Sequence, residues 1–168
     1  PGGGRTFITP RLLRHLNLVS FTSFDDDTMN RIFSTILHWY LSNNNFPAEL
    51  IKIENKVVFG TIEVYKTVLK ELRPTPTKSH YLFNLRDFAK VIFGICMADK
   101  ERIQTMDHMI RLWTHEVWRV FGDRLIADED KMLLLRSVKD IVRRTFGANF
   151  DNIFSHLDKN GDGKVDQL

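Results

Sequence analysis

Five stretches of the sequence carry apolar residues at intervals of three and four, and this spacing constrains the fold more than any other feature. It places each set of apolar side chains on one face of an α-helix. The five stretches span residues 29–40, 58–72, 85–96, 103–120 and 132–142. Clusters typical of turns separate them at residues 42–47, 73–77 and 98–100. The sequence therefore predicts a mainly α fold, a bundle of about five helices.

One short segment before the first helix is rich in β-forming residues. Residues 16–21 read Leu-Asn-Leu-Val-Ser-Phe and predict a strand. Because a lone strand has no partner here, we expect it to complete a sheet whose other strands lie upstream in a longer parent protein. No initiator Met is present, which agrees with a piece of a longer chain. The expected divisions are residues 1–22, a helical unit at 23–147 and a C-terminal segment at 148–168.

The composition is that of a soluble globular domain and excludes several classes of partner. The net charge is only +3, with acidic residues mixed among the basic ones, so no nucleic-acid partner is expected. No run of residues approaches the ~20 apolar residues of a membrane span, so no membrane partner is expected. The single Cys96 excludes an internal disulfide and is predicted to be a buried thiol.

Two motifs that would suggest catalysis fail on inspection. Gly2-Gly3-Gly4 could cradle a phosphate, but a Walker loop needs a preceding strand and a Gly-Lys-Ser/Thr ending, and Arg5-Thr6 follows instead. His115-Glu116 opens like a zinc-protease motif, but Arg119 stands where the second His is required. We therefore expect no catalysis that is complete within this chain.

The C-terminal segment matches the start of an EF-hand calcium loop. Its candidate ligands are Asp158, Asn160, Asp162, the Lys164 carbonyl and Asp166. Gly163 stands at the sharp turn and Val165 at the aliphatic position, and residues 150–157 supply an entering helix. The bidentate acid of the loop would follow Leu168 and is absent from this sequence. We therefore expect the partial loop to bind Ca²⁺ weakly or not at all.

Two arginine-bearing segments could contact an anion. Thr9 to His15 carry Arg11 and Arg14, which are either a solvated basic turn or guanidinium groups at a module edge that reach a phosphate. Asn84 is a good helix N-cap, which puts Arg86 in the first turn beside the positive end of the helix dipole. The alternative is an exposed Arg86 that pairs with Asp87 or with solvent.

Together these segments resemble the dynein heavy chain family of AAA+ motors, at the end of the third AAA+ module. PGGGR with TPRLLRHLNLVSF is similar to the stretch after sensor one, which contains the arginine-finger region and the last strand. KSHYLFNLRDFAKVIFG is similar to the sensor-two helix of the small helical lid, and FDDDTMNRIFSTIL and MIRLWTHEVWRVFGDRL also fit. The resemblance covers most of the first 147 residues. It points to axonemal inner-arm chains, a few of which carry an EF-hand-like insertion near this place.

The resemblance implies roles for three arginines. Arg86 would be the sensor-two arginine, which contacts the phosphates of nucleotide held by the Walker loop of the same module. Arg11 would be the finger that reaches the site of the preceding module, with Arg14 as the alternative. The Walker segments lie outside this sequence, so ATP or ADP with Mg²⁺ would be bound by the parent protein.

The resemblance also implies a function for the parent, an ATP-driven, minus-end-directed microtubule motor of cilia and flagella. Its location would be the cytoplasm, the cytoskeleton and the axoneme. Its partners would be microtubules, dynein intermediate and light chains and, for this lid, neighbouring AAA+ modules of the same chain. The alternative function is a Ca²⁺-responsive helical protein-interaction module, which the lack of a second calcium loop disfavours.

Overall fold

The computed structural model describes residues 7–22, 24–158 and 165, and this part of the chain is mainly helical. The α-helices are α1 (Pro10–Leu13), α2 (Asp26–Asn43), α3 (Ala48–Lys52), α4 (Glu54–Glu71), α5 (Leu85–Ile95), α6 (Met106–Val117), α7 (Asp128–Ile141) and α8 (Phe150–Ile153). Helices α6 and α7 continue into the π-helical turns η1 (Trp118–Gly122) and η2 (Val142–Phe146), and a 3₁₀ turn, η3 (Ser155–Leu157), follows α8. The five predicted helices are confirmed as α2, α4, α5, α6 with η1, and α7 with η2.

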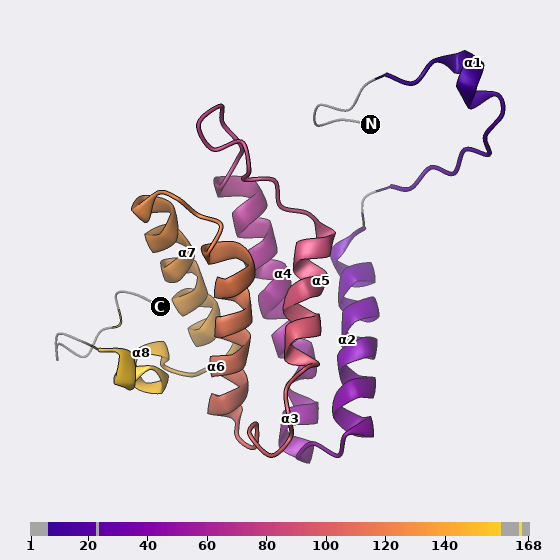
Figure 1. Ribbon diagram of the computed structural model, residues 1–168. Helices are drawn as coiled ribbons and strands as arrows, with labels where there is room; N and C mark the ends of the chain where they lie inside the picture. The colour runs from indigo at the N-terminus through magenta and orange to yellow at the C-terminus, as the bar shows by residue number, and fades with distance from the viewer. Residues whose placement is uncertain (1–6, 23, 159–164, 166–168) are drawn as a thin grey trace.

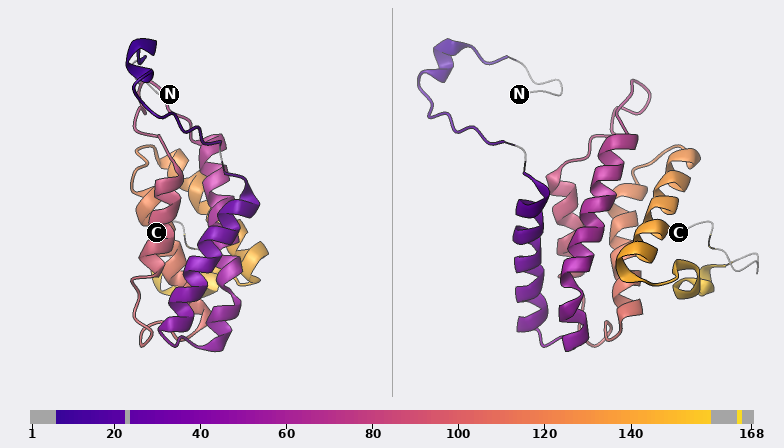
Figure 2. Two further views of the ribbon diagram at one scale, coloured as in Figure 1. Left: turned by 90° about the vertical axis from the view of Figure 1, so that its right-hand side faces the viewer. Right: turned by 180° about the vertical axis from the view of Figure 1, so that it is seen from behind.

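The long helices lie side by side in a bundle (Figures 1 and 2). Helix α4 is central because it contacts α2, α3, α5, α7 and η2. The beginnings of α2, α5 and α7 lie at one end of the bundle, the upper end in Figure 1. Within the described residues, no helix combines the length and the hydropathy needed to cross a membrane.

The segment before the bundle stands apart from it. Helix α1 and the irregular stretch that follows it extend away from the helices in Figure 1. The strand predicted over residues 16–21 is not formed: these residues have no regular secondary structure, and Leu18, Val19 and Phe21 are exposed. A strand is stable only when its backbone pairs with a neighbour, and no strand lies among the described residues to supply one.

Polar side chains fix where the long helices begin. Asp25 Oδ1 accepts a hydrogen bond from the Thr28 N–H at 3.1 Å at the start of α2, and Thr105 Oγ1 accepts one from the His108 N–H at 3.3 Å at the start of α6. The first N–H groups of a helix have no backbone partner, so such caps set its first residue. Asn84 does the same for α5.

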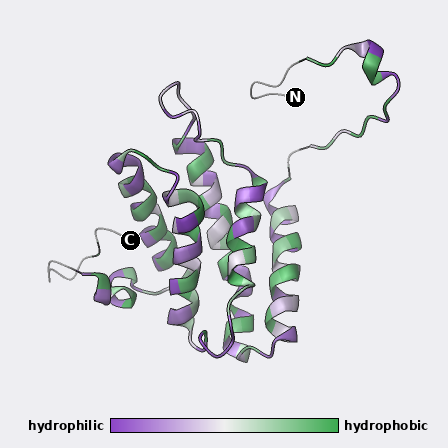
Figure 3. Ribbon diagram, in the orientation of Figure 1, coloured by the Kyte–Doolittle hydropathy of each residue, from purple (hydrophilic) through white to green (hydrophobic). Residues whose placement is uncertain are grey.

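The core is continuous across the bundle, and Trp113 of α6 is one of its largest fully buried side chains. The Trp113 indole N–H donates to Thr61 Oγ1 of α4 at 2.9 Å, and its ring lies 5.5 Å from that of Phe146. Along each long helix, hydrophobic residues alternate with hydrophilic ones (Figure 3). The predicted apolar faces are wider than the buried ones, because Ile32, Ile36, Leu69, Phe93 and Met132 are exposed.

The predicted entering helix of the calcium loop is shorter than expected. Helix α8 ends at Ile153, and η3 continues to Leu157. Of the expected apolar face, Phe150, Ile153 and Phe154 are buried. Both Nε and Nη2 of Arg111 on α6 donate to the Ile153 carbonyl, at 3.0 and 2.7 Å, so this segment is tied to the bundle.

Candidate functional site

Arg86 lies in the first turn of α5, at the end of the bundle where α2, α5 and α7 begin (Figure 1). Its side chain is exposed. Among the described residues, no carboxylate lies within ion-pair distance of its guanidinium group. A cation that is exposed and unpaired beside the positive end of a helix dipole favours an anionic ligand.

A reciprocal cap holds the backbone on either side of Arg86. Asn84 Oδ1 accepts hydrogen bonds from the N–H groups of Arg86 at 2.9 Å and Asp87 at 3.3 Å. In return, Asp87 Oδ2 accepts one from the Asn84 N–H at 3.2 Å, which completes a capping box. Because these three N–H groups already have partners, they are not free to contact an anion, whereas the guanidinium of Arg86 is.

Asp87 is the buried centre of the site, with only 3% of its surface exposed. Arg124 donates to both of its carboxylate oxygens, with Nη2 to Oδ1 at 3.0 Å and Nη1 to Oδ2 at 3.3 Å, and Lys90 Nζ lies 3.3 Å from Oδ1. Burial raises the pKa of Asp87, but the hydrogen bonds from Arg124, the Asn84 N–H and Lys90 outweigh it and hold the pKa below its usual value. Asp87 therefore pairs with Arg124 and Lys90 rather than with Arg86.

A second set of contacts anchors the segment that leads into α5. Tyr81 is almost fully buried, and its hydroxyl donates to Asp130 Oδ2 at 2.9 Å while accepting from the Ile126 N–H at 3.0 Å. Lys78 forms an ion pair with the same Asp130. Since Asp130 is in the first turn of α7, these bonds tie the approach to α5 to the start of α7.

The environment of Asp87 predicts a dependence of stability on acid. A carboxyl group stabilises the fold when its pKa is lower in the folded state than in the unfolded chain. The contribution is fully present above the ordinary pKa of about 3.9, and it is lost as the pH falls through the pKa of the folded state. We expect the free energy of unfolding, measured by urea titration from pH 7 to pH 2, to fall less steeply below pH 4 in Asp87→Asn than in the unchanged chain. At pH 7 this variant should be less stable by about 1–3 kcal/mol. Parallel curves for the two proteins would contradict the role given to Asp87.

The two other predicted arginines lie on or beside α1, away from this site. Arg11 and Arg14 are both exposed, and Arg14 Nε donates to His15 Nε2 at 3.1 Å. Helix α1 stands apart from the bundle in both views of Figure 2. The structure therefore does not bring Arg11 or Arg14 to Arg86.

Sequence reasoning named Asp87 only as a partner for Arg86, and it missed both the capping role of Asp87 and its pairing with Arg124. For Asp87 a signal exists, because an acid three residues after an Asn cap is the pattern of a capping box. For Arg124 no local signal exists, since it lies 37 residues from Asp87 and only the packing of α5 against η1 brings the two together.

The calcium-loop prediction falls mostly outside the described residues. Asn160, Asp162, Lys164 and Asp166 are among the residues that the structure does not describe, whereas Asp158 directly follows η3 as its C-cap. The described residues contain no group of three metal-binding side chains. Val165 is buried, and its N–H donates to Asp151 Oδ1 at 3.0 Å.

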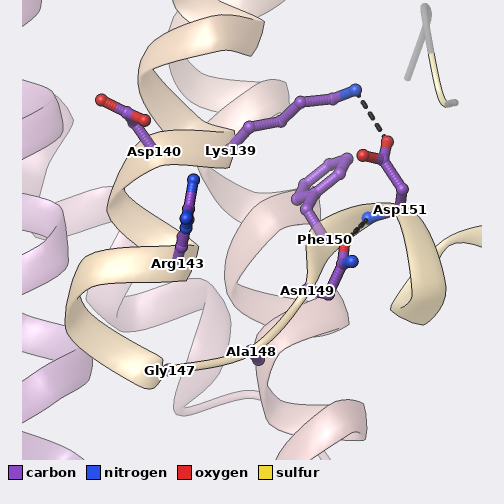
Figure 4. Close-up of a pocket in the computed structure, with 8 residues that line it drawn as sticks. All are labelled: Lys139, Asp140, Arg143, Gly147, Ala148, Asn149, Phe150 and Asp151. Atoms are coloured by element: carbon purple, nitrogen blue, oxygen red, sulfur yellow. Dashed lines mark hydrogen bonds and ion pairs between the residues drawn. The ribbon is translucent and has the colours of Figure 1, made fainter.

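A polar hollow lies where α8 meets the end of α7. Its lining residues are Lys139, Asp140, Arg143, Gly147, Ala148, Asn149, Phe150 and Asp151 (Figure 4). Lys139 Nζ pairs with Asp151 Oδ1 at 2.8 Å, and Asn149 Oδ1 accepts from the Asp151 N–H at 3.0 Å. These contacts hold α8 against the bundle. Elsewhere, burial raises the pKa of the Cys96 thiol to about 11, so it is protonated at neutral pH and unsuited to nucleophilic attack.

Comparison with known proteins gives one consistent family. Residues 30–131 match the family described as dynein heavy chain, ATPase lid domain. The chain is 50% identical over 159 residues to human (Homo sapiens) dynein axonemal heavy chain 12, and 40% identical over 161 residues to human dynein axonemal heavy chain 3. These matches cover 95% and 96% of this chain but only 5% and 4% of the relatives. The chain thus spans about one twentieth of the length of the relatives it matches.

Proposed function

The chain belongs to the dynein heavy chain family and contains its ATPase lid domain, and from this premise we propose that it is the nucleotide-responsive lid of the third AAA+ module of an axonemal motor. Residues 23–147 would form the lid, residues 1–22 the end of the preceding large subdomain and residues 148–168 a partial EF-hand. The parent would use ATP to move toward the minus end of microtubules in the axoneme of cilia and flagella. The lid would contact neighbouring AAA+ modules of the same chain and is not catalytic alone.

The exposed, unpaired guanidinium of Arg86 is the observation that carries this proposal. A phosphate near the start of α5 would meet a positive helix end, while the buried carboxylate of Asp87 is already matched by Arg124 and Lys90. The residues present therefore fit a nucleotide phosphate. Bound ATP would supply the negative charge, with Mg²⁺, and Arg86 would bind and orient its phosphates.

The same geometry explains how a lid can respond to the state of the nucleotide. Arg86 sits on a capped turn of α5, so a movement of the bundle would carry it toward or away from a phosphate. A phosphate group added at the end of the nucleotide strengthens that attraction and biases the lid toward closure. Arg11, or Arg14 in its place, would act in the same way on the site of the preceding module.

The test of this role is Arg86→Ala in the full-length heavy chain, with the other nucleotide sites inactivated. Losing a charge-assisted hydrogen bond of about 1.5–3 kcal/mol should weaken binding of a fluorescent ATP analogue by about 10- to 100-fold. The matched control is Arg102→Ala, which removes the same charge from the loop between α5 and α6, at the opposite end of the bundle. It should leave the affinity unchanged. Equal effects of the two variants, or no effect of Arg86→Ala, would contradict the proposed role.

A further inference from the structure

We propose that Arg124 is a positioning residue for Arg86, an inference that rests on the nucleotide-contacting role proposed for Arg86. Arg124 lies in the connection between η1 and α7, far from α5 in the sequence. Its guanidinium group nevertheless contacts the chain on both sides of Arg86. It thereby holds the turn that carries Arg86 without itself being the group that reaches the phosphate.

Arg124 contacts residues that precede Arg86 in the sequence and the residue that follows it. Before α5, Arg124 Nη1 donates to the Leu82 carbonyl at 3.1 Å, and the guanidinium carbon lies 5.0 Å from the centre of the Phe83 ring. After the start of α5, the two Nη atoms hold both carboxylate oxygens of Asp87. Only a planar guanidinium can make these contacts together, because a lysine ammonium lacks the two-pronged geometry.

Removing Arg124 should disturb Arg86 in two ways. The first turn of a helix frays easily, and without Arg124 the capping-box residue Asp87 would keep only Lys90 as a cationic partner. The Asp87 carboxylate would also lose its bidentate cation, so its negative charge would compete with a phosphate for Arg86. Both effects act on nucleotide binding only through Arg86.

This dependence can be measured with a double-mutant cycle in the full-length heavy chain. The variants are Arg124→Gln, Arg86→Ala and the two combined, and the readout is the affinity of this module for a fluorescent ATP analogue. Arg124→Gln should weaken binding by about 5- to 10-fold, less than Arg86→Ala, because the guanidinium of Arg86 is kept but misplaced. In the Arg86→Ala background, Arg124→Gln should have no further effect.

Matched variants separate positioning from a general loss of stability. Arg119→Gln breaks a comparable ion pair with the buried Glu116, away from the start of α5, and should lower thermal stability while leaving nucleotide affinity unchanged. Arg124→Lys keeps the charge and should lose about 2- to 3-fold in affinity; it serves as the test if Arg124→Gln does not fold.

Three outcomes would overturn the assignment. They are additive effects of the two substitutions, an unchanged affinity in both Arg124 variants, and an equal loss in Arg119→Gln. If Arg86→Ala alone leaves the affinity unchanged, the proposed function fails first, and that result is distinct from a cycle in which Arg86 matters but Arg124 acts independently.

Discussion

Replacing Trp113 with alanine should lower the free energy of unfolding by about 3–5 kcal/mol, the usual cost of removing a large buried aromatic side chain. The Trp113 side chain is fully buried and joins α6 to α4 and η2 through Thr61 and Phe146. The substitution would leave a cavity between three elements. The Thr61 hydroxyl would keep its bond to the Val57 carbonyl at 2.7 Å, so the loss would come mainly from packing.

The measurement is urea-induced unfolding followed by circular dichroism, with Trp39→Ala as the matched control. The Trp39 side chain on α2 is 64% exposed, so its removal should change stability by less than about 0.5 kcal/mol. A small effect of Trp113→Ala, similar to that of the control, would show that the core is not organised around this indole.

Gly94→Ala should also destabilise the chain, by about 1–3 kcal/mol, although the same change within an exposed helix stabilises by about 1 kcal/mol. Gly94 lies on the face of α5 that packs against Glu116 of α6. A Cβ atom at this position would overlap the carboxylate of Glu116 and lie 2.8 Å from its Cγ. Glu116 is only 7% exposed and pairs with Arg119, so it cannot move aside freely.

A second variant isolates the cause of this effect. In the Glu116→Ala background the clash is gone, so adding Gly94→Ala should be neutral or stabilising in the same urea titration. If Gly94→Ala alone, with Glu116 in place, raises the free energy of unfolding, then Glu116 does not pack against Gly94 as described.

The fold could be predicted largely from the sequence because each long helix carries its own signal. The three- and four-residue spacing marked α2, α4, α5, α6 and α7, and every one is present. The width of the buried faces could not be predicted in the same way. Ile32 and Ile36 satisfy the spacing of a helix face but are exposed, since burial depends on which neighbours lie beside α2.

The local features of the candidate site could be predicted from the sequence, whereas the contacts made by tertiary packing could not. Asn84 and Arg86 could be placed at a helix start because capping is a local property of the sequence. The partner of Asp87 could not be predicted, because Arg124 reaches it only through the folding of α5 against η1. The strand predicted at residues 16–21 remains a prediction about the parent protein, where a neighbouring strand could pair with it.

Arg86 of this lid is proposed to bind the phosphates of a nucleotide held elsewhere in the same module. A structure of the full-length heavy chain with an ATP analogue bound in that module tests it directly. We expect the Arg86 guanidinium to lie within about 3 Å of a phosphate oxygen, with Arg124 still paired to Asp87. A structure in which the lid is closed over nucleotide while Arg86 points to solvent or to another protein group would contradict it.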